Sequence, residues 1–211
     1  MMDNPKELYL EGYAAFDQGR FSDAMSLATR CLATASPDSY WHFGSLGLRC
    51  WAANFLGDNT SVERDADALL SEDAGSEKPW FDGLALLNLG LARYRAGRTT
   101  EAKELFAQAS ERYFAHRINS EHPPEWQLVS EFFAAATRWA AFGEVDRMKQ
   151  LADKLASLHD PDKEMEHLSH AIGLYQRHAG KEDVRAEATA TAREGVSRAF
   201  LAIILLEVMS Q

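Results

Sequence analysis

The amino-acid sequence predicts an all-α protein in which helices alternate with short turns. Three observations support this fold class. Apolar and small residues recur at spacings of three and four along most of the 211-residue chain, which is the period of an α-helix. Glycines that end these runs stand at positions 19, 57, 97, 143 and 180, so the turns repeat about every 40 residues. The six prolines leave the longest periodic segments uninterrupted, as helices require.

The segment 86–109 carries the clearest copy of the repeating unit. Its first half has apolar residues at helical spacing and ends at Gly97, in the manner of a glycine that follows a helix C-terminus. Its second half places Ala102 and Phe106 on one face of a second helix. Because Gly90 and Ala102 are small, we expect the two helix backbones to approach each other closely.

We expect the unit to recur from the first residues of the chain onward. A hairpin over 5–36 turns at Gly19, and a second hairpin over 39–71 turns at Gly57. The third hairpin, 79–118, contains the segment described above. Each break between these ranges is rich in Ser, Asp, Pro and Gly, the residues that favour turns.

Two more hairpins are expected in the C-terminal part. The fourth, 124–158, turns at Gly143, and the fifth, 163–209, turns at Gly180. Within the fifth, residues 182–209 form one long helix or two. All breaks are short, so we expect one continuous domain that covers residues 1–211.

The segment 86–109 resembles a tetratricopeptide repeat. Leu89-Gly90 and Ala102-x3-Phe106 match the pattern of that family directly, and Leu86 stands where the family usually has Trp. The first hairpin matches through Gly12, Gly19, Phe21, Ala24 and Pro37. The second hairpin lacks the pair of small residues, and the fourth has Ala136 in place of the glycine. The resemblance implies a right-handed α-solenoid of about five antiparallel helical hairpins, followed by an apolar C-terminal helix.

In the family, the first helix of each hairpin lines a concave groove that receives a peptide, and the resemblance implies such a groove here. The residues expected to point into it are Tyr9, Tyr13, Phe16, Trp51, Phe55, Leu87, Leu91, Tyr94, Arg95 and Phe133, with Thr137, His170, Leu174 and Arg177 further along. This lining is aromatic and apolar, which favours an apolar or amphipathic peptide segment of a partner protein. The charged set that holds a C-terminal carboxylate in chaperone-binding relatives is replaced by Tyr9, Tyr13, Leu48, Leu84 and Asn88. The alternative is that several of these aromatic residues fill the core between helices.

The expected function is therefore that of a non-catalytic interaction module: an adaptor, a chaperone or a regulatory subunit. A second hypothesis starts from "AFLAIILLEVM" (199–209), which is apolar almost all round. Large exposed apolar surfaces mark interfaces, so this helix predicts a self-assembling structural or scaffold protein. Its candidate interface residues are Phe200, Leu201, Ile204, Leu205 and Val208. The alternative to self-assembly is that this helix folds back and caps its own solenoid.

The charge balance narrows the choice of partner. The chain has 22 basic and 32 acidic residues, a net charge of −10, which disfavours direct contact with nucleic acid or with anionic lipid. The longest apolar run is about half of what a membrane span requires. The N-terminal residues do not resemble a signal peptide, and Cys31 and Cys50 form no CxxC pair. We therefore expect a cytoplasmic protein.

We expect neither catalysis nor a cofactor. The sequence has no GxSxG, GxxxxGK, GxGxxG or CxxC motif. His167 and His170 are three residues apart beside Glu164 and Glu166, but HExxH is missing and no cysteine is near, so no metal site is expected. A third and more remote hypothesis is a small-molecule sensor or enzyme that uses the concave pocket.

Overall fold

The computed structural model describes residues 4–119, 124–158 and 163–209. Within these residues the chain forms eleven α-helices and no strand, which confirms the predicted all-α class. The helices are α1 (Pro5–Asp17), α2 (Phe21–Thr34), α3 (Tyr40–Leu56), α4 (Asn59–Ser71), α5 (Lys78–Arg95), α6 (Thr99–Asn119), α7 (Pro124–Phe142), α8 (Asp146–Ala156), α9 (Lys163–Ala179), α10 (Arg185–Arg193) and α11 (Arg198–Met209). A 3₁₀ turn at Gly75–Glu77 precedes α5.

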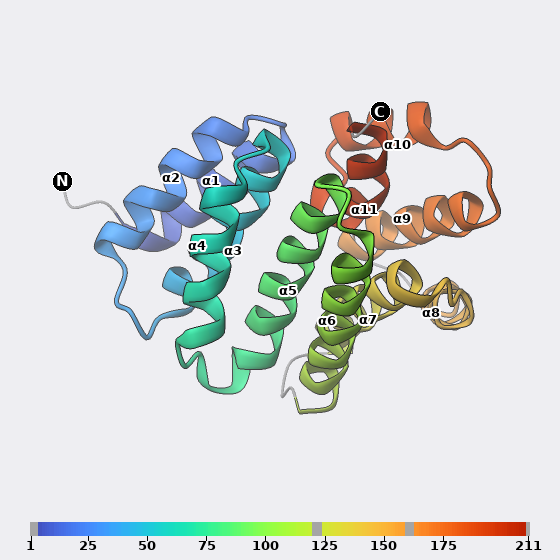
Figure 1. Cartoon of the computed structure of the whole chain (residues 1–211), viewed down its shortest axis with the longest axis horizontal. Coiled ribbons are helices and arrows are strands. Elements are labelled where there is room, and N and C mark those ends of the chain that lie inside the picture. Colours follow the sequence, from blue (N-terminus) through green and yellow to red (C-terminus); the bar gives the residue numbers. More distant parts are fainter. Residues whose placement is uncertain (1–3, 120–123, 159–162, 210–211) are drawn as a thin grey trace.

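Consecutive helices pack against each other along the chain, from α1 against α2 to α8 against α9 (Figure 1). At the C-terminal end, α10 packs against α11. Helices that are two apart in the chain also touch: α3 contacts both α1 and α5, and α9 contacts both α7 and α11. Helices packed in consecutive pairs are compatible with the helical-repeat architecture expected from the sequence.

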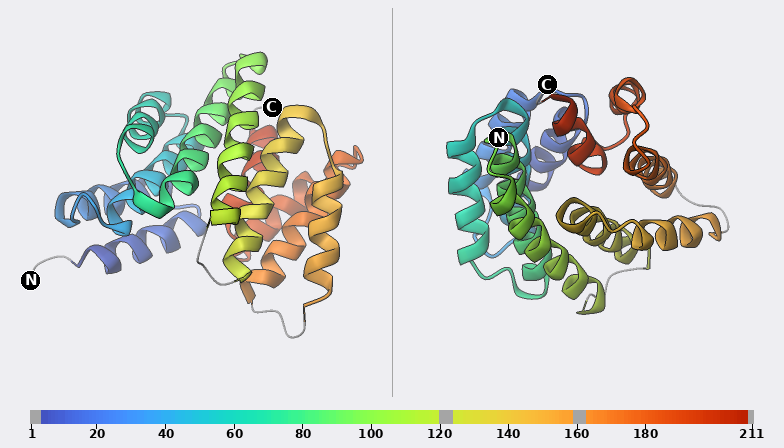
Figure 2. Two further views of the ribbon diagram at one scale, coloured as in Figure 1. Left: turned by 90° about the horizontal axis from the view of Figure 1, so that it is seen from below. Right: turned by 45° about the vertical axis from the view of Figure 1, so that its right-hand side comes forward.

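The two ends of this row of helices meet. Helix α11 contacts α5, α7 and α9, and the residues at its start reach α1. Ser197 Oγ lies 3.2 Å from Tyr13 Oη, and the backbone N–H of Arg198 donates to Asp17 Oδ1 at 3.4 Å. The right-hand view of Figure 2 shows the C-terminal helix in dark red beside the N-terminal helices in blue. The first and last helices are therefore joined by direct contacts.

The helix boundaries follow local capping chemistry. Asn4 Oδ1 accepts a hydrogen bond from the backbone N–H of Lys6 at the start of α1, where Pro5 has no N–H group that would need an acceptor. Ser39 caps α3, and Asp58 caps α4 by accepting from the N–H of Ser61 at 3.1 Å. Such side chains satisfy the first N–H groups of a helix, which have no partner within the helix.

Glycine ends four of the helices at the predicted turns. Gly19, Gly57, Gly97 and Gly143 adopt φ angles between 72° and 76°, where a side chain would be strained. The fifth expected turn was assigned to the wrong residue, since Lys181 (φ 67°) takes the left-handed conformation after α9 and Gly180 does not.

The five ranges expected to be hairpins contain α1–α2, α3–α4, α5–α6, α7–α8 and α9–α11. The last range holds three helices because the segment 182–209, for which one or two helices were expected, is interrupted at Gly195 (φ 96°).

The contact between α5 and α6 has the close approach that the sequence predicts. A Cβ atom added to Gly90 would lie 2.5 Å from the ring of Phe106, and Ala102 is completely buried. One hydrophobic core runs from α1 to α11 and includes residues of every helix between them. Cys31 and Cys50 are buried free thiols.

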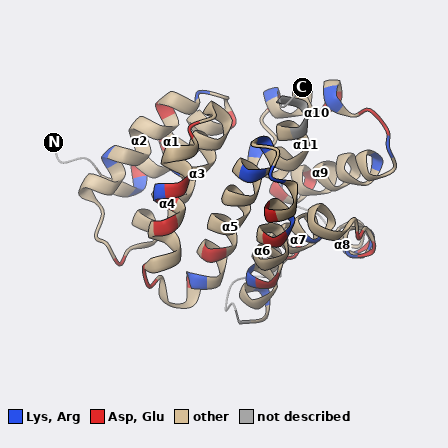
Figure 3. Ribbon diagram, in the orientation of Figure 1, with Lys and Arg blue, Asp and Glu red and all other residues tan. Residues whose placement is uncertain are grey.

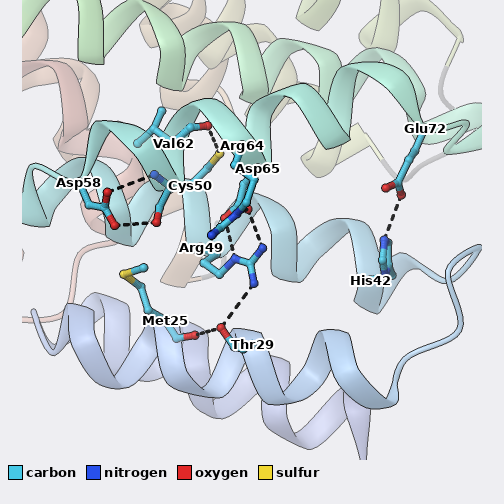
Figure 4. A network of polar contacts seen from close by, with 11 residues as sticks. Met25, Thr29, His42, Arg49, Cys50, Asp58, Val62, Arg64, Asp65 and Glu72 are labelled. Carbon is cyan, nitrogen blue, oxygen red and sulfur yellow. Dashed lines mark hydrogen bonds and ion pairs between the residues drawn. The ribbon is translucent and has the colours of Figure 1, made fainter.

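A buried ion pair joins α3 to α4 (Figure 4). Asp65 is fully buried, and its two carboxylate oxygens accept from Nε and Nη2 of Arg49, each at 2.6 Å. Arg64 adds a third bond to the same carboxylate at 2.8 Å, and Arg49 also reaches Thr29 Oγ1 on α2 at 3.5 Å. The charge-assisted bonds fix the relative position of the helices α2, α3 and α4.

Acidic and basic residues are interspersed along α4, α6 and α8, whereas α11 carries no charge between Arg198 and Glu207 (Figure 3). Among the described helices, none combines the length and the apolar character that crossing a membrane requires.

Candidate functional site

A pocket of about 310 Å³ opens where α1, α3, α5, α7 and α9 meet α11, a surface that we call the inner face. Its lining is Tyr9, Leu10, Tyr13, Tyr40, Trp41, Gly44, Leu48, Trp51, Trp80, Phe81, Leu84, Tyr113, Trp126, Val129, Phe133, Glu164, Ala199 and Phe200. Eleven of these 18 residues are aromatic, and they include four of the five tryptophans in the chain. We call this site the aromatic pocket. Its volume lies in the range of pockets that bind ligands.

Many of the aromatic residues stand at the beginnings of helices. Tyr40 and Trp41 open α3, Trp80 and Phe81 are the third and fourth residues of α5, and Trp126 is the third of α7. The starts of α3 and α5 are in contact, with the ring centroids of Tyr40 and Phe81 5.9 Å apart. None of these five residues was among the predicted groove residues. The signal that distinguishes them is their shared position in the first turn of an odd-numbered helix.

The rings of the pocket support each other. Tyr9 packs edge to face on Tyr40, with centroids 6.0 Å apart and planes at 82°, and lies 5.6 Å from Trp41. On the α5–α7 side, Trp80 packs edge to face on Phe133 at 5.5 Å and 84°. Edge-to-face pairs stabilise each other beyond the area that they bury. The walls of the pocket are therefore formed before any ligand arrives.

Three large apolar side chains at the mouth of the pocket face solvent. Leu10 is 51% exposed, Tyr40 is 43% exposed and Trp126 is 48% exposed. Deeper lining residues such as Trp51 and Phe133 are buried. An exposed apolar rim around an aromatic pocket is typical of a binding site, because the rim loses water contact when a ligand covers it.

Polar groups are few and lie at one side. Glu164 of α9 is the only charged side chain among the lining residues named above. Burial and the nearby carboxylate of Asp17 raise the pKa of Tyr13, whose hydroxyl group lies against Ser197. Burial also raises the pKa of Asp17 to about 6, against the lowering effect of the Arg198 backbone N–H and guanidinium. The edge of the pocket is therefore acidic.

Helix α11 closes the pocket from the inside. Phe200 lines it, and its ring packs edge to face on Phe132 at 5.6 Å and 79°. Leu201, Ile204 and Leu205 are buried with Phe200 in the common core. These four candidate interface residues thus contact the chain itself, in the arrangement that the sequence left as the alternative. The side chain of the fifth, Val208, lies outside the described part of the structure.

Nine of the first ten predicted groove residues are found in three places. Four of them line the aromatic pocket: Tyr9, Tyr13, Trp51 and Phe133. Leu91 and Tyr94 line a second pocket of about 380 Å³, whose wall includes Ile203 of α11. Phe16, Phe55 and Leu87 are buried among the helices, with Phe16 edge to face on Phe55 at 5.5 Å. Part of the set is thus core, as the alternative interpretation allowed.

Arg95, the tenth predicted groove residue, is bonded within the chain. Its guanidinium donates to the backbone carbonyl of Asn54 and, at 2.7 Å, to the side-chain oxygen of the same residue. A third bond reaches Asn59 Oδ1 at 3.2 Å. Arg95 therefore ties the end of α3 and the start of α4 to the end of α5.

No protein-family model, no curated protein and no solved structure matches this chain. Within the described residues, no group of three or more His, Cys, Asp and Glu side chains is arranged to hold a metal ion. His170, considered as a ligand at the sequence level, has its Nε2 3.0 Å from Thr191 Oγ1. The aromatic pocket therefore offers a ligand aromatic and apolar surfaces, and it has one carboxylate, that of Glu164, at its edge.

Proposed function

We propose that this protein is a non-catalytic interaction module that binds an apolar or amphipathic segment of a partner protein on its inner face. One or two anchor side chains of that segment enter the aromatic pocket, and the rest of it covers the rim. The observation that carries the proposal is the exposed apolar rim of Leu10, Tyr40 and Trp126 around a preformed aromatic cavity. Sites of this kind gain most of their affinity from a few aromatic anchors.

The proposed architecture is a right-handed, tetratricopeptide-like α-solenoid whose first helices line the binding surface. The contacts of α3 with α1 and α5, and of α9 with α7 and α11, support this arrangement. Support for a helical ligand comes from α11, an apolar helix that already lies against α5, α7 and α9. The roles that fit are adaptor, chaperone or regulatory subunit. The buried free thiols of Cys31 and Cys50 suit a reducing, cytoplasmic compartment.

The test uses the rim, because its side chains are half exposed and tolerate change. A Leu10→Ser/Trp126→Ser variant keeps the helices and removes two apolar contacts at the pocket mouth. The partner is identified by capture with the wild-type protein and mass spectrometry, and its affinity for both proteins is then measured. We expect the double variant to lose about 100-fold or more in affinity, since each buried apolar anchor contributes on the order of 1–3 kcal/mol.

The matched control is Leu56→Ser, which replaces a similarly exposed leucine that lines none of the pockets described here. This variant keeps the affinity of the wild type if the pocket is the binding site. An affinity that is unchanged in the rim variant, while its circular dichroism and melting temperature match the wild type, contradicts the proposal.

An alternative proposal is self-assembly, in which α11 of one copy takes the place of α11 in another. Residues 199–206 favour it because they are an uninterrupted apolar run whose side chains are all buried, and an exchange would preserve these contacts. Gel filtration with light scattering tests it over a wide range of concentrations. A monomer at the highest concentration contradicts the alternative.

A further inference from the structure

The hydroxyl groups at the N-terminal wall of the aromatic pocket are already engaged. Tyr13 Oη lies 3.2 Å from Ser197 Oγ, and the side chains of Tyr9 and Tyr40 interact closely enough for each to shift the pKa of the other. The indole and phenol rings that remain present their faces and edges to the cavity. A ligand that relies on several hydrogen bonds gains little at this wall, whereas a group recognised by ring faces suits it.

The faces of Trp and Tyr rings attract cations, because the π electrons give each face a partial negative charge. The structure contains an example at this pocket, since Lys6 Nζ lies 6.0 Å from the centroid of the Trp41 ring. The stem of an alkylammonium group is also apolar, so it matches the rest of the lining.

The formal charges around the pocket have the sign that a cation requires. Glu164 lines it, and none of the 18 lining residues is Lys, Arg or His. Asp17 stands behind Tyr13 and is close enough to Glu164 for the charge of Glu164 to affect it. The chain as a whole carries a net charge of −10. Lys6 and Arg198 offset part of this field, but neither lines the cavity: Lys6 lies over the Trp41 ring, and Arg198 faces Asp17 and the ring of Phe21.

We propose that the group which enters the aromatic pocket is an organic cation on an apolar stem, namely an alkylammonium group. This inference rests on the proposed function, since it names the anchor that the partner segment inserts. A trimethylammonium head with a short apolar stem is small enough for a cavity of about 310 Å³. The cation lies among the rings of Tyr9, Trp41 and Trp126, with Glu164 balancing its charge.

The test compares two probes of the same shape. Benzyltrimethylammonium carries a positive nitrogen, and neopentylbenzene has a neutral carbon in its place. Four of the five tryptophans line the pocket, so binding of either probe is followed by intrinsic fluorescence. We expect the cation to bind at least about tenfold more tightly than its neutral isostere, as one or two cation–π contacts provide.

Variants separate charge from shape. Glu164→Gln weakens binding of the cation by about three- to tenfold and leaves the isostere unchanged, because only the charge at the pocket edge is lost. Glu166→Gln is the matched control, since this exposed residue of the same helix lines a different pocket, and it changes neither affinity. Trp126→Leu keeps apolar bulk at the rim and lowers the preference for the cation.

Equal affinity for the two probes overturns the inference, as does binding of neither probe. In both cases the dependence of partner capture on Leu10 and Trp126 still tests the proposed function separately. If the proposed function fails instead, the cation still binds selectively to the pocket. The inference is also contradicted if Glu164→Gln and Glu166→Gln weaken the cation equally, because the effect is then one of overall charge.

Discussion

The first six helices and the last five are packed by different means. In α1, α3 and α5, a Cβ atom added to Gly12, Gly44, Gly83 or Gly90 would come within 3.0 Å of a neighbouring side chain. In α9, a Cβ atom added to Gly173 would meet nothing within 4 Å. The N-terminal helices therefore approach their neighbours closely at glycines, whereas Gly173 of α9 makes no such close contact.

Buried polar groups differ in the same way. In the N-terminal part, Asn54 Nδ2 donates to Asn88 Oδ1 at 2.6 Å, linking α3 to α5, and Asp65 pairs with Arg49 between α4 and α3. In the C-terminal part, buried Thr137 bonds to the carbonyl of Phe133 within its own helix, and buried Thr191 of α10 lies 3.0 Å from Nε2 of His170 of α9, but α11 has no such buried polar group within 199–206. Directional contacts between helices thus specify the N-terminal arrangement, whereas the seating of α11 depends mainly on apolar burial.

The largest expected effect concerns the buried ion pair. Asp65→Ala leaves the guanidinium of Arg49, which is mostly buried, without its carboxylate. We expect the free energy of unfolding to fall by about 3 kcal/mol, as for other broken buried pairs. Denaturant unfolding measures it. Asp23→Ala, which breaks an exposed pair with Arg20, is the control and costs at most about 1 kcal/mol. Equal losses in the two variants would show that Asp65 is not buried as described.

Replacing a glycine by alanine is expected to change the stability of the protein in opposite directions in the two regions. Gly90→Ala pushes a methyl group into the ring of Phe106 and destabilises the fold by about 1–3 kcal/mol. Gly173→Ala fills open space inside a helix and stabilises it by about 0.5–1 kcal/mol. Thermal melts of both variants check the prediction. The contrast between the regions is wrong if the two substitutions shift the melting temperature in the same direction.

The smallest expected effect lies where the two regions meet. Burial raises the pKa of Asp17 to about 6 from an ordinary value of 3.8, so between these values the native state binds more protons than the unfolded state. The free energy of unfolding therefore falls as pH rises from about 4 to about 6. Asp17→Asn removes this dependence. We expect the variant to exceed the wild type in stability by about 1 kcal/mol at pH 7, less than the ~3 kcal/mol of the full shift, because Asp17 is partly exposed and solvent screens its charge.

Below about pH 4 the Asp17 carboxyl becomes neutral in both states, so the variant and the wild type converge there. Denaturant unfolding over this pH range gives the comparison. A constant difference between the two proteins at every pH would show that the introduced amide acts through packing and that the Asp17 carboxyl has the same pKa in the native and unfolded states.

The ends of helices were predictable from the sequence where the conformational preference of a single residue decides them. Gly19 and Gly97 end helices because glycine adopts positive φ without strain. The same rule failed at Gly180, because its neighbour Lys181 takes the left-handed residue's place and the sequence does not tell adjacent candidates apart. Gly12, Gly90 and Gly173 each stand seven residues before a glycine that was expected to end a helix. Gly173 nevertheless lacks the close packing of the other two, because packing depends on the neighbouring helix and not on this spacing.

The site was harder to predict than the fold. The family resemblance selected Tyr9 and Trp51, which line the aromatic pocket, yet it also selected Phe55, which is buried in the core against Phe21. It missed Trp80 and Trp126, because their position in one pocket depends on how successive helices rotate against each other. The apolar pattern of 199–206 left open whether this helix packs against another subunit or against its own chain, because the pattern does not identify the surface that covers it.

The position of α11 also sets the order in which the binding surface can form during synthesis. Tyr13 and Ser197 are 184 residues apart in sequence, and Phe200 forms part of the pocket wall. A nascent chain that has emerged only as far as α10 displays the inner aromatic surface with its last wall missing. Under the proposed function, such a chain would offer apolar segments an incomplete pocket, and the docking of α11 would complete it.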